Sequence, residues 1–175
     1  MENRLPITMQ IVKETLINYI ETEMSVGGIL EDVETFRRSY QSDEALNAPL
    51  IWLKKHPTIP DDSANGGKNH NLNNMLYLVM PCEFVCVDYD QDPELAETKS
   101  ENLATRVGET IRKHFNKLAA DENYPVKVFN TMRFYALYTT DQVNILGKSQ
   151  KTPASNLVVE FVFRIDWSAC NRITI

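Results

Sequence analysis

An alternation of apolar and other side chains runs through residues 157–167, near the C-terminal end of the sequence. One set of positions holds Leu157, Val159, Phe161, Phe163, Ile165 and Trp167, and the other holds Val158, Glu160, Val162, Arg164 and Asp166. A period of two is typical of a β-strand with one face on a core and the other toward solvent or a partner. At ~3.4 Å per residue the strand spans roughly 37 Å. We expect it to begin at Leu157, because the preceding Thr152 to Ser155 segment has loop character.

Two other segments carry apolar residues at helical spacing. Residues 6–23 begin with Pro6, which suits a first helical turn, and then repeat apolar residues every three or four positions. The second helix is predicted to start at Asp92-Pro93-Glu94, which combines an N-cap, a first-turn proline and an acidic first turn. It should extend to about Ala119. Its apolar stripe comprises Leu95, Leu103, Val107, Ile111, Phe115 and Leu118. We also expect an exposed pair between Glu109 and Lys113.

Three further strands are predicted: residues 50–53, which follow Pro49, residues 75–88 and residues 125–138. Pro81 interrupts the second of these strands and predicts a bulge, a bend or an edge position. Residues 30–40 are expected to form a short helix or an irregular turn, and residues 139–155 to be mostly loop, with a short extended piece at 143–146. This order predicts one α+β domain over residues 1–175. Its mainly antiparallel four-stranded sheet should carry two helices on one face.

Residues 54–74 form a long polar segment with two prolines, a Gly-Gly pair and five asparagines. A loop of this length within a compact domain is usually functional or disordered. Gly66-Gly67-Lys68 lacks the first glycine and the hydroxyl residue of a phosphate-binding loop. His56 and His70 have no carboxylate or cysteine at ligand spacing, so we interpret them as solvated or interface residues.

Composition and motifs argue against several classes of function. A net charge of −6 argues against nucleic acid or an anionic membrane as the main partner. Asp88, Asp90 and Asp92 alternate after a strand, but they lack the glycine and downstream Glu of a calcium loop. Cys82 and Cys86 are predicted to be buried thiols, too far apart along one strand for a disulfide. We therefore expect no cofactor, no metal and no enzymatic activity.

Four pieces of the chain, taken in order, carry a resemblance to a known family. They are IVKETLINYIETEM, VETFRRSYQSDEALNAPLIWLKK, PCEFVCVDYDQDPELAETKSENLATRVGETIRKHF and KSQKTPASNLVVEFVFRIDW. Together they cover most of the chain, and the layout resembles the tail terminator (tail completion, or neck) proteins of tailed bacteriophages. No piece is a catalytic signature.

The resemblance implies a structural virion protein of the tail or neck, assembled in the host cytoplasm. Such proteins form a ring, typically a hexamer, that caps the tail tube, ends its polymerisation and joins the tail to the head side. The implied partners are further copies of the chain, the tail tube protein, the head-completion or connector protein, and the sheath where the tail is contractile. DNA would pass through the lumen without specific binding, and no membrane is involved.

A closed ring needs surface segments that reach neighbouring subunits. Residues 54–74 and 139–155, with the polar side of the last strand, supply the candidates for subunit or partner contact. These are His56, Lys68, His70, Lys148, Lys151, Glu160, Arg164 and Asp166. For the last three residues, an ordinary solvated sheet face is an equal alternative. Three other functions stay open: a head-closure or connector neck protein, a small enzyme or ligand-binding domain of unknown substrate, and an adaptor that binds peptides at a sheet edge.

Overall fold

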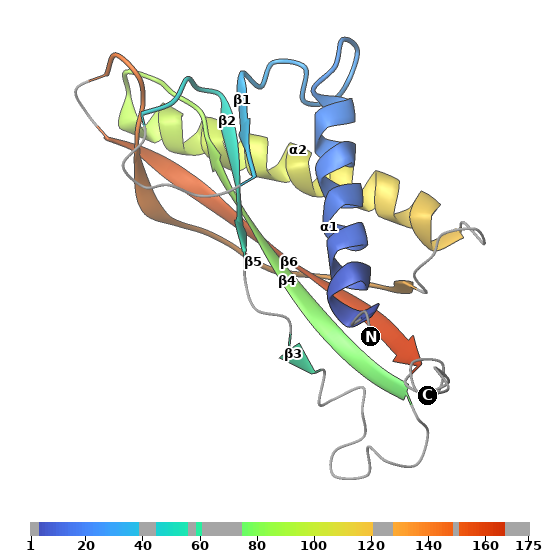
Figure 1. The fold of residues 1–175 in the computed structure, drawn as a ribbon. Helices are drawn as coiled ribbons and strands as arrows, with labels where there is room; N and C mark the ends of the chain where they lie inside the picture. Colours follow the sequence, from blue (N-terminus) through green and yellow to red (C-terminus); the bar gives the residue numbers. More distant parts are fainter. Residues whose placement is uncertain are drawn as a thin grey trace.

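The structure, a computed structural model, describes residues 4–38, 45–55, 59–60, 75–120, 128–148 and 151–166. It is an α+β fold (Figure 1). The elements in chain order are α1 (Arg4–Glu23), β1 (Thr35–Arg37), β2 (Leu50–Lys55), β3 (Ile59–Pro60), β4 (Met75–Val87), α2 (Pro93–Ala120), β5 (Val128–Asn144) and β6 (Lys151–Asp166). Both predicted helices are confirmed, and α2 begins at the proline that follows the Asp92 cap.

The sheet has the strand order β1-β2-β4-β6-β5, and β3 also pairs with β4. All pairings are antiparallel except that of β1 with β2, so the sheet is mixed. The predicted four antiparallel strands correspond to β2, β4, β5 and β6. The expectation of a helix or turn at residues 30–40 is wrong for Thr35–Arg37, which forms β1. Phe36 in this strand packs against the main core, and this burial favours the extended conformation.

The last strand begins six residues earlier than predicted, at Lys151 rather than Leu157. Pro153 has no N–H to donate to a neighbouring strand, but its position in the sheet means that this missing hydrogen bond costs little stability. It pairs with Gln142 next to a register shift in β5, and it precedes Ser155, the first β6 residue that pairs with β4. Residues 139–155 are therefore mostly the paired ends of β5 and β6, and the expectation of a loop there is wrong.

Pro81 lies inside β4 without a bulge. The register between β4 and β6 is continuous through the Pro81–Glu160 pair. On the opposite side, the partner of β4 changes from β2, which ends at Cys82, to β3, which begins at Val79. Pro81 falls between these two pairings, so its missing N–H interrupts neither. The predicted bulge is therefore absent from the β6 side, and residues 56–58, which would lie opposite Pro81 on the other side, are outside the described residues.

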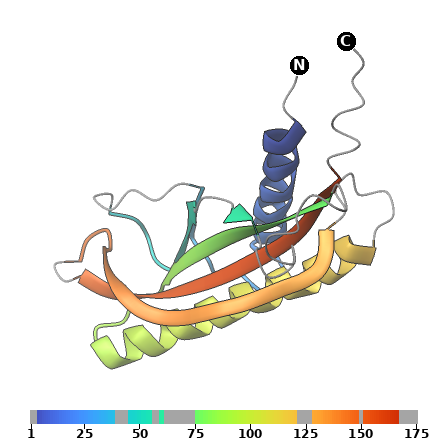
Figure 2. The same ribbon diagram turned by 90° about the horizontal axis from the view of Figure 1, so that it is seen from below.

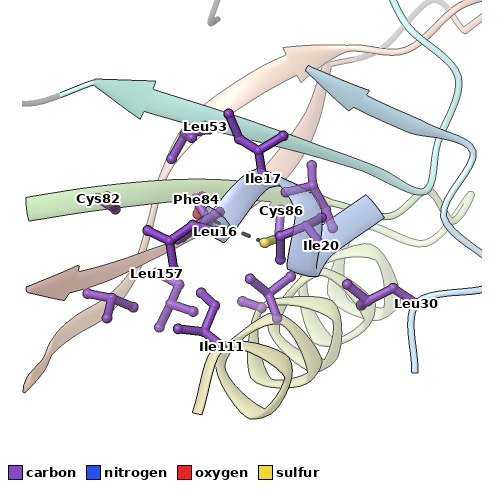
Figure 3. Close-up of a cluster of buried hydrophobic side chains, with 14 of the residues drawn as sticks. Leu16, Ile17, Ile20, Leu30, Leu53, Cys82, Phe84, Cys86, Ile111 and Leu157 are labelled. Carbon is purple, nitrogen blue, oxygen red and sulfur yellow. Dashed lines mark hydrogen bonds between the residues drawn. The ribbon is translucent and has the colours of Figure 1, made fainter. Parts of the chain in front are cut away.

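Both helices contribute to one core on the same face of the sheet, as predicted. Figure 3 shows Leu16 and Ile20 of α1 close to Phe84 and Cys86 of β4, with Ile111 of α2 beside them. The α2 stripe is predicted correctly where its members are described, from Leu103 to Phe115. Leu95 is the exception, with 51% of its surface exposed, because the first turn buries Ala96 instead.

A second core cluster lies on the other face of the sheet. Its largest member is Trp52, which packs with Val85 and Val87. The segment before β2 closes over this cluster, since Leu46 forms a parallel bridge to Ile145 and its carbonyl accepts from the N–H of Leu146 at 3.0 Å. The sheet is therefore curled, and residues flanking β2 and β5 meet at one end (Figure 2). Within the described residues, neither helix combines the length and apolarity that a membrane crossing needs.

Candidate functional site

The structure divides the predicted contact residues into two groups. Lys148 and Lys151 lie at the connection between β5 and β6 and are exposed. Glu160 is half-buried in the middle of β6, and Arg164 and Asp166 lie near its end. At ~3.3 Å per residue, Lys151 and Asp166 are roughly 50 Å apart. The two groups therefore cannot form one contact patch. His56, Lys68 and His70 lie outside the described residues.

The described part of the connection between β5 and β6, residues 145–148, is a tight turn. Gly147 has a φ of 75°, a left-handed conformation that favours glycine, and the N–H of Lys148 donates to the Ile145 carbonyl at 3.1 Å. The Lys148 ammonium lies 4.2 Å from the ring centroid of Tyr89, in the loop after β4. Leu146 is 59% exposed. This end of the sheet thus presents an apolar side chain beside two cations.

The start of α2 is built by aspartates that serve as local caps. The Asp92 carboxylate accepts from the N–H of Glu94 at 3.0 Å, and its carbonyl accepts from Ala96 at 2.9 Å. Asp90 accepts from the Asp92 N–H at 3.1 Å and pairs with Lys99 at 2.8 Å, which lowers the pKa of Asp90. These bonds favour the turn interpretation over a cation site. No cluster suited to a metal occurs among the described residues.

One hydrogen bond places the start of α2 beside the start of β6. The Ser100 hydroxyl donates to the Pro153 carbonyl at 3.1 Å and accepts from the N–H of Asp88 at 3.0 Å. Figure 1 shows the first turns of α2 at the same end of the molecule as the β5–β6 connection. Glu94, Leu95 and Glu97 are exposed on these turns, and the two glutamates, three positions apart, share a face of the helix. The same turns also carry the exposed Lys99, which pairs with Asp90.

A polar cluster crosses the curled side of the sheet next to Trp52. The buried Glu83 carboxylate lies 3.3 Å from the Lys54 ammonium and accepts from the Asn156 amide at 2.7 Å, both at Oε1. The three side chains come from adjacent strands, so their contacts join β2, β4 and β6. Sequence reasoning missed this cluster. The available signal was Glu83 itself, a carboxylate within the apolar run of β4.

A second buried carboxylate, Glu23, joins the end of α1 to α2. Its Oε1 atom lies 2.7 Å from the Lys113 ammonium and 2.6 Å from the His114 Nε2 atom, and its Oε2 atom accepts from the Ile29 N–H at 3.1 Å. The pKa of Glu23 is lowered to about 2. The hydrogen bond from Lys113 contributes most, followed by the hydrogen bonds with Ile29 and His114. The His114 ring stacks on Tyr19 with centroids 4.5 Å apart. Lys113 thus pairs with Glu23, and the expected pair with Glu109 is wrong.

The segment between α1 and β1 is held to α2 by a second cation. Arg106 binds both carboxylate oxygens of Asp32, at 2.5 and 3.0 Å, and donates to the Ile29 carbonyl at 3.1 Å. This pair lowers the pKa of Asp32. The described buried charges therefore join neighbouring elements of the fold.

No protein-family model matches the chain, and no curated protein matches it.

Proposed function

We propose that the chain is a structural virion protein: a ring-forming tail terminator that caps the tail tube of a bacteriophage and joins it to the head side. The observation that carries this proposal is the order of the elements. A helix, short strands, a long strand, an acidic turn, a long helix and two long strands follow one another, and the four resembling sequence pieces lie along them in this order. Its partners would be other copies of itself, the tail tube protein and a head-side connector protein.

The use of charge in the described residues supports a structural role. Glu23 and Glu83 are the buried carboxylates, and each is bound by cations or amides from other elements. Catalytic carboxylates instead converge on a site where a substrate can reach them. Such buried ion pairs and hydrogen bonds suit a rigid structural subunit whose surface residues make the contacts with other proteins.

Solution mass and electron microscopy test this proposal together. We expect light scattering and negative-stain images to show a ring of about six subunits, or a monomer that forms rings when tail tubes of the same virus are added. Added protein should also stop further growth of the tubes. A monodisperse monomer that leaves tube growth unchanged would contradict the proposal. Binding to connector complexes but not to tubes would favour the head-closure alternative.

A further inference from the structure

Lys54, Glu83 and Asn156 lie on one face of three adjacent strands. Lys54 of β2 is directly opposite Glu83 of β4. Asn156 of β6 is directly opposite Val85, which lies two positions beyond Glu83 and so on the same face of β4. Lys54 and Asn156 are therefore placed diagonally, on either side of the Glu83 carboxylate.

One carboxylate oxygen holds the other two groups together. The Glu83 Oε1 atom lies 3.3 Å from the Lys54 Nζ atom and 2.7 Å from the Asn156 Nδ2 atom, so the two nitrogens are no more than about 6 Å apart. Lysine carries its amine on a flexible four-carbon stem. Rotation about the bonds of this stem can bring Nζ to ~3–3.5 Å from the Asn156 Cγ atom, the separation from which a bond can form.

The surroundings of the three groups are largely apolar. Glu83 and Asn156 are buried, and the Lys54 side chain is 23% exposed. Trp52 and Val85 of the second core cluster lie beside them in the sheet and are fully buried. In such surroundings a lysine ammonium can pass its proton to a neighbouring carboxylate, since both groups then become neutral. The resulting amine is a nucleophile.

We infer that Lys54 and Asn156 form an intramolecular isopeptide bond, with Glu83 as the general acid and base. The neutral Nζ atom of Lys54 attacks the Cγ atom of Asn156. The Glu83 carboxylic acid protonates the amide nitrogen and receives a proton from the attacking nitrogen. The Nζ–Cγ bond forms, the Cγ–Nδ2 bond breaks, and Nδ2 leaves as ammonia. Ammonia then takes up the proton that Lys54 first gave to Glu83, which returns to the carboxylate form.

This reaction occurs once in each chain and needs no oxidant or second reactant. The bond would join β2 to β6 across β4, the three central strands of the path β1-β2-β4-β6-β5. It closes a loop of about 100 residues, and a cross-link over a long loop restricts the unfolded chain strongly. The inference goes beyond the proposed function and does not depend on it.

Intact mass spectrometry in denaturing solvent tests the bond, after the folded protein has been incubated until its mass no longer changes. We expect a mass about 17 Da below the value calculated from the sequence, because one ammonia is lost. Trypsin should leave the chain uncut after Lys54 and release a branched peptide that joins the segments around Lys54 and Asn156. Lys54→Arg, Asn156→Ala and Glu83→Gln should each abolish this peptide. Lys148→Arg, the same kind of change at an exposed turn, is the control and should retain it.

Loss of the branched peptide in the three variants, with circular dichroism spectra of folded protein, supports the inference. If a variant does not fold, the branched peptide of the wild-type protein decides alone. Wild-type protein with the full calculated mass and no branched peptide overturns the inference. A loss of ammonia that persists in Lys54→Arg also overturns it, because that loss arises elsewhere in the chain. Bond formation in Glu83→Gln overturns the role of Glu83. The measurement involves neither rings nor tubes, so its failure leaves the proposed function as it stands.

Discussion

The Nε2 atom of His114 on α2 lies 2.6 Å from the Oε1 atom of Glu23 at the end of α1. Lys113, the neighbouring residue, reaches the same oxygen at 2.7 Å. One carboxylate with only 7% of its side chain exposed therefore receives two donors from one helix. This contact joins residues about 90 positions apart in the sequence, and it fixes where α1 ends relative to α2.

Glu23→Gln should destabilise the fold by about 1–2 kcal/mol at pH 7. This value is smaller than the full pKa shift of Glu23 implies, because Lys113 is nearly half exposed and water screens its charge. The folded-state pKa of Glu23 is lowered from 4.5 to about 2, so its contribution is present above about pH 4.5 and is lost as the pH falls toward 2. Urea unfolding across this range should show the difference between variant and wild type shrinking with acidification. A difference that is constant between pH 7 and pH 2.5 would show that Glu23 acts through packing alone.

Gly28→Ala should be more damaging than Gly27→Ala. A Cβ atom at Gly28 would lie 2.1 Å from the backbone oxygen of Glu23, so the turn after α1 would have to move, and we expect a loss of about 2 kcal/mol or more. Gly27 has a φ of 84° but nothing within 4 Å of an added Cβ, so its loss should be about 1 kcal/mol. Thermal unfolding of the two variants gives the comparison, and equal losses would contradict the close approach at Gly28.

Leu103→Ala and Leu95→Ala form a matched pair on α2. Leu103 is fully buried in the main core, and its truncation should cost about 2–5 kcal/mol. Leu95 is 51% exposed, and its truncation should change the stability of the monomer by no more than about 0.5 kcal/mol. Urea denaturation of both variants measures these values. A large loss for Leu95→Ala in dilute, unassembled protein would place that side chain in the monomer core.

The thiols of Cys82 and Cys86 should resist alkylation in the folded protein. Both are buried, and burial raises the pKa of Cys82 to about 12 and raises that of Cys86 as well. In a Cys170→Ser background, iodoacetamide at pH 8 should label neither thiol within the time that labels both in urea. Rapid labelling without denaturant would show that the face of β4 packed against α1 and α2 opens readily.

Local signals identified most of the elements, and non-local pairing explains the errors. The Asp92-Pro93-Glu94 sequence located the start of α2, because a cap and a first-turn proline act through neighbouring residues. Thr152 to Ser155 has weak strand propensity, and only pairing with β5 and β4 makes it part of β6. The same reason applies to β1, a strand of three residues that depends on β2.

The same contrast between local signals and non-local contacts applies to the predicted contact residues. The sequence indicated Lys148 and Lys151 because they lie on a polar segment near the last strand, and both are exposed at one end of the sheet. That they lie at the same end of the molecule as the start of α2 follows from non-local contacts, among them the hydrogen bond between Ser100 and Pro153, which are 53 positions apart. The Glu23 and Glu83 clusters were missed because buried charge pairs have no fixed spacing along the chain.

The strand that comes last among those described, β6, lies in the interior of the sheet, between β4 and β5. During synthesis on the ribosome, β2, β4 and α2 therefore emerge before the strand that completes their core. The nascent chain cannot build this sheet from one edge to the other, and the apolar faces of β4 and α2 remain incompletely covered until residues 151–166 have been made. We expect the domain to acquire its stable fold in one late cooperative step, with the exposed intermediate as the species that chaperones would bind.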